Sequence, residues 1–332
     1  MVSRRRFNVC LAGIVAAAAG IPRPATANND KFPARPVRII VPYAAGGGPD
    51  VLTRKMAVRL ADVLDKDAAV IVDNMVGAGG ILAAQNVARM APDGYNLLLG
   101  ASSHIVQKAM EPTVRFDPMT DFAHITRTAF TPSVLVVSAT SPYMTLQQLL
   151  DAAARAPGKL NYASGGIGSA AHLSAAAMVL HAKLDVVHVP YKGSVEIVPS
   201  IISGTTQFAF PIASTAIPQI RAGKVRALAV TSAARMPALA DVPTLSEAFG
   251  TPDLVLDSWF GLWAPAGTPS AIVDLLFNAV TKTYQDAALR ADSEAAGAVV
   301  SLSRSPAEFT QFMEAETLKL GKLVRAAHLT TK

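Results

Sequence analysis

Short apolar segments alternate with alanine-rich helical stretches along most of this chain. Strands that are buried in a parallel sheet are brief and almost continuously apolar, whereas the helices that connect them are longer. A repeated order of strand and helix is typical of α/β units around mainly parallel sheets. The pattern therefore predicts an α/β fold.

The first hundred residues contain three such steps. We expect strands at residues 37–42, 69–73 and 96–100, and helices at residues 50–64 and 81–90. Glycine-rich loops lead from the first two strands into their helices. Such a loop leaves backbone N–H groups unpaired at a helix start, where the helix dipole favours negative charge.

A second series begins near residue 133. Its expected strands are at residues 134–137, 160–163, 185–189, 207–210 and 225–231. Its expected helices are at residues 146–154, 170–181, 195–203 and 213–222. The series is complete enough to predict a second α/β lobe.

An extended apolar stretch at residues 255–264 follows, with tryptophans that we expect to pack at a hinge, and a helix is expected at 271–287. Since no strong strand comes later, the last helices should pack on the first lobe. The predicted first lobe is 28–130 plus 254–332, and the second is 131–253. Proteins with two such crossings usually close around a ligand by hinge motion.

The amino terminus resembles an export signal of the twin-arginine type. Arg4, Arg5 and Arg6 precede a short apolar run at residues 9–19, and a small-x-small cleavage site lies at 25–27. A membrane anchor is the alternative, but the run has only about half of the ~20 residues that a spanning helix needs. We therefore expect a signal peptide at 1–27 that is cleaved, and no later run could span a bilayer.

Removal of this signal changes the charge of the protein. The whole chain has 30 basic and 24 acidic residues, and residues 1–27 hold four arginines and no acid, which leaves 26 basic against 24 acidic residues and a net charge of +2. Without a basic stripe or an aromatic nucleic-acid motif, nucleic-acid binding is not expected. The one cysteine, Cys10, lies in the signal, so the mature protein should have no disulfide or thiol chemistry.

The first glycine loop, Gly46-Gly47-Gly48, is followed by Pro49 and Asp50. It is either a seat for a carboxylate or phosphate or a tight turn, and three consecutive glycines exceed what a turn requires. It is not a nucleotide P-loop, because no Gly-Lys-Ser/Thr follows. We expect Asp50 to stabilise the first helical turn rather than to face an anion.

The second glycine loop covers residues 164–169 and offers two hydroxyls and several N–H groups at a helix start. A dinucleotide fingerprint fits poorly, because the next strand, near His188, ends without the acidic residue that would bind a ribose. Binding of a small anion by Ser164, Gly168 and Ser169 is the better interpretation. Two such loops that face each other would clamp a small anion.

The histidines give no metal or nucleophile pattern. His172, His181 and His188 have no cysteine or glutamate at ligand spacing, so neither a metal nor a cofactor is expected. His172 lies one turn into the helix and either touches a ligand or packs between helices. A hydrolase using Ser164 and His172 is a rival hypothesis, but the Gly-x-Ser-x-Gly elbow is absent, and we expect no enzyme.

A loop at residues 190–194 lies between a strand and a helix. Tyr191 could cover the ligand and Lys192 could supply a positive charge in the cleft. An ordinary exposed turn is the alternative, since lysine is usually solvated.

Nine short motifs, in one order over essentially the whole chain, resemble the Bug family, the periplasmic solute-binding proteins of tripartite tricarboxylate transporters. They are RPVR at 35–38, IVP at 40–42, GAGG at 77–80, APDGY at 91–95, NYAS at 161–164, HVPYKG at 188–193, LAVTS at 228–232, DVPT at 241–244 and APAGTP at 264–269.

The resemblance implies a type II periplasmic-binding fold, two α/β lobes with a ligand cleft between them. It implies a monomer in the periplasm that captures a small organic carboxylate and delivers it to a two-component membrane permease. A sensor subunit that signals to a membrane kinase is the alternative. In the family, one carboxylate is held by N–H groups and waters at the first glycine loop, here residues 45–48. The candidate ligand-binding residues are Tyr43, Ala45, Gly46, Gly47, Gly48, Ala78, Ser102, Ser164, Gly168, Ser169, His172 and Tyr191.

Three departures from the family pattern bear on the ligand. Pro49 stands where many relatives have Ser or Thr, and Ala44-Ala45 replaces a pair that commonly contains proline. Pro211 stands where relatives often carry an Asp that would favour an ammonium group. We therefore expect a simple organic acid rather than an amino acid.

Overall fold

The computed structural model describes residues 32–191, 194–327 and 329, and the predicted signal peptide lies outside them. The strands are β1 Val37–Val41, β2 Val70–Asn74, β3 Asn96–Ala101, β4 Phe122–Thr131, β5 Val134–Ser138, β6 Asn161–Ser164, β7 Val187–Pro190, β8 Phe208–Ala209, β9 Val225–Val230, β10 Ser258–Pro265 and β11 Val299–Val300. The α-helices are α1 Gly48–Leu64, α2 Ile81–Val87, α3 Ser102–Met110, α4 Leu146–Arg155, α5 Ala170–His181, α6 Ile197–Ile202, α7 Ala213–Arg221, α8 Leu245–Phe249, α9 Ser270–Thr283, α10 Ala287–Ala295 and α11 Pro306–Ala326. Short 3₁₀ segments are η1 Ala78–Gly80, η2 Ser194–Glu196, η3 Pro237–Leu239 and η4 Pro252–Leu254.

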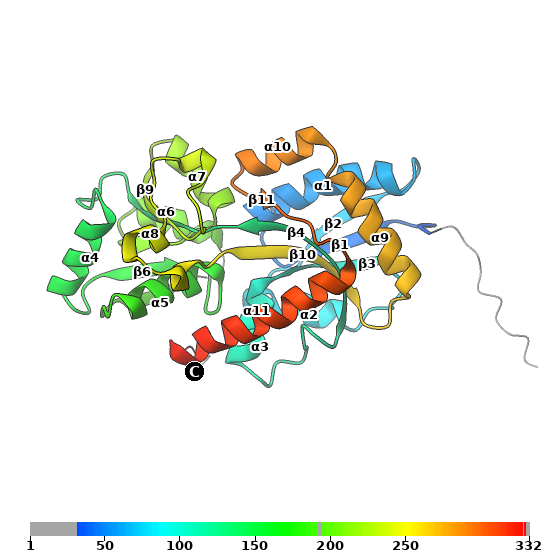
Figure 1. Ribbon diagram of the computed structural model, residues 1–332, viewed down its shortest axis with the longest axis horizontal. Helices are drawn as coiled ribbons and strands as arrows, with labels where there is room; N and C mark the ends of the chain where they lie inside the picture. Colours follow the sequence, from blue (N-terminus) through cyan, green and yellow to red (C-terminus); the bar gives the residue numbers. More distant parts are fainter. Residues whose placement is uncertain (1–31, 192–193, 328, 330–332) are drawn as a thin grey trace, which may run out of the picture. The chain divides into compact units, whose positions relative to one another are not determined.

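Six strands form one mixed sheet, in the order β11-β4-β10-β3-β1-β2 (Figure 1). β1 lies between β2 and β3 and is parallel to both. β10 runs antiparallel between β3 and β4, and β11 is antiparallel to β4. The carboxyl ends of β1 and β3 therefore lie at the same edge of this sheet.

The other five strands form a second mixed sheet, in the order β7-β6-β8-β5-β9. β6 is parallel to β7 and β8, whereas β5 is antiparallel to β8 and β9. The predicted α/β fold is confirmed. The sheets are mixed rather than mainly parallel, because β4, β5 and β10 lead from one sheet to the other and reverse the strand direction there.

The chain passes between the sheets twice, and the two passages lie side by side. β4 ends at Thr131 and β5 begins at Val134, while β10 begins at Ser258, opposite Thr131. The Thr231 N–H donates to the Ser133 carbonyl at 3.0 Å, and the Leu256 N–H donates to the Thr231 carbonyl at 3.1 Å. β4 and β10 thus form one ribbon beside the junction (Figure 1).

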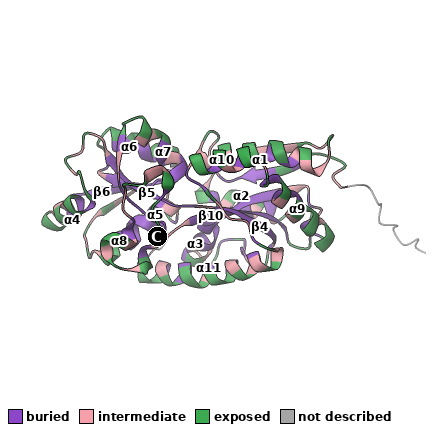
Figure 2. Ribbon diagram, turned by 45° about the horizontal axis from the view of Figure 1, so that its top comes forward, coloured by how far each residue is buried: buried purple, intermediate pink, exposed green. Residues whose placement is uncertain are grey.

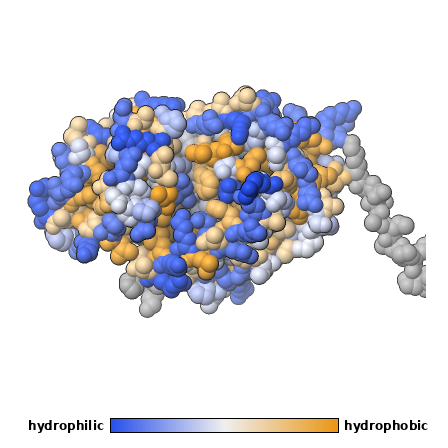
Figure 3. Space-filling view, viewed as in Figure 1, coloured by the Kyte–Doolittle hydropathy of each residue, from blue (hydrophilic) through white to orange (hydrophobic). Residues whose placement is uncertain are grey.

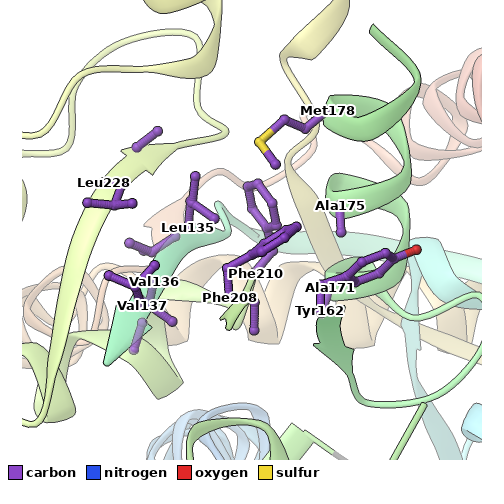
Figure 4. Packing of buried hydrophobic residues seen from close by; sticks show 14 of the residues in the cluster. Leu135, Val136, Val137, Tyr162, Ala171, Ala175, Met178, Phe208, Phe210 and Leu228 are labelled. Atoms are coloured by element: carbon purple, nitrogen blue, oxygen red, sulfur yellow. The ribbon is translucent and has the colours of Figure 1, made fainter. Parts of the chain in front are cut away.

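Each sheet has its own apolar core. Buried residues follow the strands of both sheets, whereas the outward faces of α1 and α11 are exposed (Figure 2). In the five-stranded sheet, Phe208 and Phe210 lie at the centre of the packing, and Ala171 and Ala175 of α5 lie beside Tyr162 (Figure 4). Small residues on α5 let the helix approach the sheet closely. The position of this helix sets the position of the second glycine loop.

The tryptophans of the return strand β10 are wholly buried, as expected for packing residues. Trp259 and Trp263 lie 6.3 Å apart between ring centroids, and Trp259 meets Phe309 and Phe312 of α11 edge to face. The Trp259 indole N–H donates to the Glu316 carboxylate at 3.1 Å. The last helix therefore packs on the six-stranded sheet.

One predicted helix differs from the structure, and several observed elements were not predicted. The helix expected at 271–287 is two helices, since α9 ends at Thr283 and Asp286 caps α10 by accepting from the Leu289 N–H. Neither α3 nor β4 was expected, although β4 is a long central strand. Its polar residues, among them His124 and Arg127, interrupt the apolar run by which buried strands are recognised.

In the part of the chain that the structure describes, no helix combines the length and apolar character needed to cross a membrane. Figure 3 shows one face of the molecule, on which hydrophilic residues surround separate hydrophobic patches.

Candidate functional site

A cavity lies between the helix starts of the two sheets. It contains about 80 Å³ that the centres of water molecules can reach, which is room for several waters or one small organic molecule. Its walls are Pro42, Tyr43, Ala44, Pro49, Val76, Gly77, Gly79, Gly80, Ser103, Gly165, Ser169, Ala170, Ala171, Ile197, Pro211, Ile212, Ser258 and Phe260. Both sheets contribute walls, so the cavity depends on the position of one sheet against the other.

The first turns of α1, α3 and α5 lie at this cavity. Pro49, Ser103 and Ala170 lie in the first turns of α1, α3 and α5 and also line the cavity. The first N–H groups of a helix have no partner inside the helix, and no side chain caps α1. The positive ends of three helix dipoles thus lie beside one small space, which favours an anion there.

Hydroxyl groups add hydrogen-bond donors to the same walls. The Tyr43 hydroxyl lies 3.4 Å from the Ser103 hydroxyl, and Ser169 and Ser258 add two more. Burial raises the pKa of Tyr43 to about 12, although the bond with Ser103 opposes the rise. Tyr43 is therefore neutral at physiological pH, and its hydroxyl can donate a hydrogen bond to a carboxylate.

None of the described side chains on the cavity wall is charged. Asp50 is 2% exposed and lies next to the first glycine loop, where it accepts from the Gly46 N–H at 2.8 Å, from Asn74 at 2.8 Å and from Arg54. Burial opposes ionisation of Asp50, but the bonds from Arg54, Gly46 and Asn74 together hold its pKa below the usual value. Asp50 is thus ionised and neutralised locally.

The first glycine loop uses some of its N–H groups internally. The Gly46 N–H donates to Asp50, and the Gly47 N–H donates to the Ala44 carbonyl at 3.2 Å. Ala45 and Gly46 to Gly48 are not on the cavity wall, whereas their neighbours Ala44 and Pro49 are. Of the residues predicted around this loop, Tyr43 alone lines the cavity in this structure.

Gly48 marks a close approach between the two sheets' helices. A Cβ atom at Gly48 would lie 2.1 Å from the Ser214 hydroxyl oxygen and 2.7 Å from its Cβ, and Ser214 is in the first turn of α7. On the other side, a Cβ at Gly168 would lie 3.2 Å from the Met110 sulfur in α3. The cavity is therefore bounded by direct contact between the two halves of the protein, namely the elements packed around the six-stranded sheet and those packed around the five-stranded sheet.

Two histidines, His172 and His188, form hydrogen bonds with the second glycine loop. The Ser164 hydroxyl lies 2.6 Å from His188 Nε2, and the Gly168 N–H donates to His172 Nδ1 at 3.0 Å. The two imidazole rings stack with centroids 4.0 Å apart. Ser169 caps α5, since its hydroxyl accepts from the His172 N–H at 3.3 Å.

Both histidines are neutral at physiological pH. Burial, reinforced by the neighbouring His188, lowers the pKa of His172 to about 3, and burial lowers the pKa of His188 to about 4. Neither ring lines the cavity. Ser164 is wholly buried and is bonded to His188 rather than to His172, which leaves the Ser164 and His172 pair of the hydrolase hypothesis without its geometry.

The remaining predicted residues lie next to the cavity. Ala78 is between the wall residues Gly77 and Gly79, and the Ser102 hydroxyl lies 3.0 Å from the Ser258 hydroxyl. The Tyr191 N–H donates to the Ser164 carbonyl at 2.9 Å, and the side chain packs on the core of the five-stranded sheet. Lys192 lies outside the described residues.

The described residues contain no group of three or more His, Cys, Asp or Glu side chains that could hold a metal ion.

Sequence reasoning missed much of the apolar wall. Ser258 and Phe260 come from β10, Ile197 begins α6, and Ile212 precedes α7. Pro211, next to Ile212, was singled out only as a departure from the family pattern. Alternation along β10 could have suggested that Ser258 and Phe260 share a face opposite Trp259. Nothing in the local sequence indicates that this face meets the loop after β1.

Comparison with known proteins places the chain in a family. The model of the tripartite tricarboxylate transporter family receptor matches residues 52–329. Protein BugT of Bordetella pertussis is 32% identical over 315 residues, which is 94% of this chain and 95% of BugT.

Solved structures agree with this match. A protein of R. palustris solved with adipate has a TM-score of 0.85 and 31% identity, covering 90% of this chain and 99% of that one. MatC from Rhodopseudomonas palustris with bound malate has a TM-score of 0.82 and 30% identity, covering 88% of this chain and all of that one. The resemblance drawn from the nine sequence motifs is thereby confirmed: this chain belongs to the tripartite tricarboxylate transporter receptors, the periplasmic solute-binding family that includes the Bug proteins.

Proposed function

We propose that this protein is a periplasmic receptor that binds one small organic carboxylate in the cavity between its two sheets. The observation that carries the proposal is the convergence of three helix starts and four hydroxyls on a wall whose described side chains are all uncharged. Such a wall binds an anion through N–H and O–H donors rather than through an ion pair. Adipate and malate in two related structures support this class of ligand.

The ligand-binding groups belong to two lobes, 28–130 plus 254–332 and 131–253, that close about the β4 and β10 ribbon. The first lobe offers Tyr43 and the first glycine loop, and the second offers Ser169 and the second glycine loop. Contact across the cavity at Gly48 supports a closed arrangement. Closure removes water from the ligand and strengthens each hydrogen bond to it.

The proposed function also includes export of the protein to the periplasm and delivery of its ligand to a membrane transporter. A signal peptide at residues 1–27 directs the chain to the periplasm, where it hands its ligand to the membrane subunits of a tripartite transporter and catalyses no reaction. The family match supports this role. Loss of carboxylate uptake in cells that lack the gene, with uptake restored by the intact gene, is the expected cellular result.

The direct test is calorimetric titration of the ligand-stripped protein with organic acids. A ligand that binds the folded state alone also raises the midpoint of thermal unfolding. We expect binding of at least one carboxylate, and no binding of its uncharged amide. The absence of binding by every acid tested, after complete stripping, would remove the proposal.

One variant connects binding to the cavity. Tyr43→Phe removes a hydroxyl that can donate to the carboxylate, and the expected loss of affinity is about tenfold or more, since hydrogen bonds to charged groups are worth roughly 1.5–3 kcal/mol. Tyr284→Phe is the matched control, because burial raises the pKa of the Tyr284 hydroxyl as well but Tyr284 is not on this cavity. Equal affinity of the two variants would mean that the ligand binds elsewhere.

A further inference from the structure

The walls of the cavity differ in polarity. The donors described above suit one carboxylate group. The remaining side chains are apolar, namely those of Pro42, Pro49, Val76, Ile197, Pro211, Ile212 and Phe260. The cavity thus offers hydrogen-bond donors at the helix starts and hydrocarbon contacts over much of its remaining wall.

The apolar residues of the second lobe cannot pair a second charge. Ile197, Pro211 and Ile212 have no side-chain donor or acceptor. A charged group or a hydroxyl group that moves from water to a site without a hydrogen-bond partner loses several kcal/mol of solvation free energy. A second carboxylate, an ammonium group or a hydroxyl on the ligand would meet this penalty against such a wall.

Nearby charges do not relieve the penalty. Arg54, behind the first loop, is already bonded to Asp50 and Asn74, and Lys319, near α5, is bonded to Glu316. Asp50 is neutralised by Arg54 and leaves no free cation for a second carboxylate there. The described groups around the cavity therefore favour one negative charge over two.

We infer that this receptor selects a monocarboxylate with an apolar body, aliphatic or aromatic, and discriminates against dicarboxylates, hydroxy acids and amino acids. The inference rests on the proposed function and names the ligand class for the same cavity. Selectivity arises because a second carboxylate, a hydroxyl or an ammonium group on the ligand would lose its hydration shell beside Pro211 and Ile212 and would gain no hydrogen-bond partner there. Apolar contact with Phe260 and Ile197 favours the preferred body.

A series of acids matched in length tests this selectivity. Hexanoate and adipate have the same number of carbons and differ by one carboxylate, as do butanoate and succinate, and malate adds a hydroxyl to succinate. Titration of the ligand-stripped protein is expected to give each monocarboxylate an affinity about tenfold or more above that of its dicarboxylate. Benzoate should bind better than succinate.

The outcomes separate the two proposals. If adipate binds as tightly as hexanoate, or malate as tightly as butanoate, the selectivity inference is overturned while the carboxylate receptor stands. If no carboxylate binds, the proposed function fails and the inference fails with it. Preference for the monocarboxylate in both pairs supports the inference.

A substitution tests which wall provides the selectivity. Ile212→Lys puts a cation on the apolar wall, and the ratio of adipate to hexanoate affinity should rise about tenfold or more. Ile202→Lys, at an exposed isoleucine of α6 that is not on the cavity, should leave the ratio unchanged. A ratio that does not move in Ile212→Lys, with the same unfolding midpoint as the native protein, would overturn the role of this wall.

Discussion

Asp257 should make the folded protein less stable as the pH rises through neutrality. The carboxyl group lies just before β10, its Oδ1 atom is buried without a hydrogen-bond partner, and Lys319 and Glu316 are its charged neighbours. Burial raises the pKa of Asp257 to about 7 from 3.8, Lys319 opposes the rise and Glu316 adds to it. The folded state therefore holds this proton more tightly than the unfolded state.

The magnitude follows from linkage between protonation and folding. A carboxyl group whose pKa is higher in the folded state costs no stability below the unfolded pKa, an increasing amount between the unfolded and the folded pKa, and a constant amount above the folded pKa. The rise from 3.8 to about 7 sets an upper limit of about 4 kcal/mol, at about 1.4 kcal/mol per pH unit. Asp257→Asn removes the charge and should raise the free energy of unfolding at pH 8 by about 1–4 kcal/mol.

Urea unfolding at pH 4, 6 and 8 measures the difference between the variant and the native protein. The difference should be close to zero at pH 4, grow through pH 6 and be largest at pH 8. Asp253→Asn, at an exposed aspartate of η4, is the control and should give no such trend. If Asp257→Asn is no more stable than the native protein at pH 8, or gains equally at every pH, the reasoning from burial is wrong.

Two further substitutions address the contact between the halves and the first glycine loop. Gly48→Ala should weaken ligand binding about tenfold or more in titration calorimetry, because the new Cβ would overlap Ser214 when the halves are closed. Adding Ser214→Gly to the same chain removes the overlapping side chain and should restore the affinity. If the affinity is not restored, Gly48 acts in another way. Asp50→Asn removes the charge that Arg54 and the Gly46 N–H stabilise, so stability should fall by about 1–2 kcal/mol at pH 7. Because the pKa of Asp50 is below its usual value, the loss of stability should be present above pH ~4 and should disappear as the pH falls through the lowered pKa of the folded state. Urea unfolding of the variant and the native protein at pH 3 and pH 7 checks the sign of this dependence.

The sequence predicted elements well where local pattern alone determines them. The helix predicted at 170–181 is α5, Ala170–His181, because Ser169 provides a cap and the apolar residues continue for three turns. The helix predicted at 271–287 was too long, because the break near Asp286 depends on a capping bond that alanine-rich pattern does not reveal. Periodicity finds a helix more reliably than it finds the end of one.

The lining of the candidate cavity was predicted in part. Both glycine loops were found, and Tyr43 and Ser169 do line the cavity. The internal acceptor of the Gly46 N–H could not be found from spacing, because it depends on the rotamer of Asp50 four residues later. Phe260 was missed for a different reason, since it reaches the cavity through strand pairing between segments more than 150 residues apart in sequence.

The pairing of β4 with β10 has a kinetic consequence. Two neighbouring strands tie the halves together, with Ser258 opposite Thr131 at the junction. If the halves close about this ribbon as proposed, the motion left to them is a bend or twist of two paired strands rather than a diffusive search. We then expect a bound acid to stabilise the closed state with little loss of rotational freedom. Release would reverse the same motion, so we expect the stiffness of this ribbon to set how long the ligand is retained.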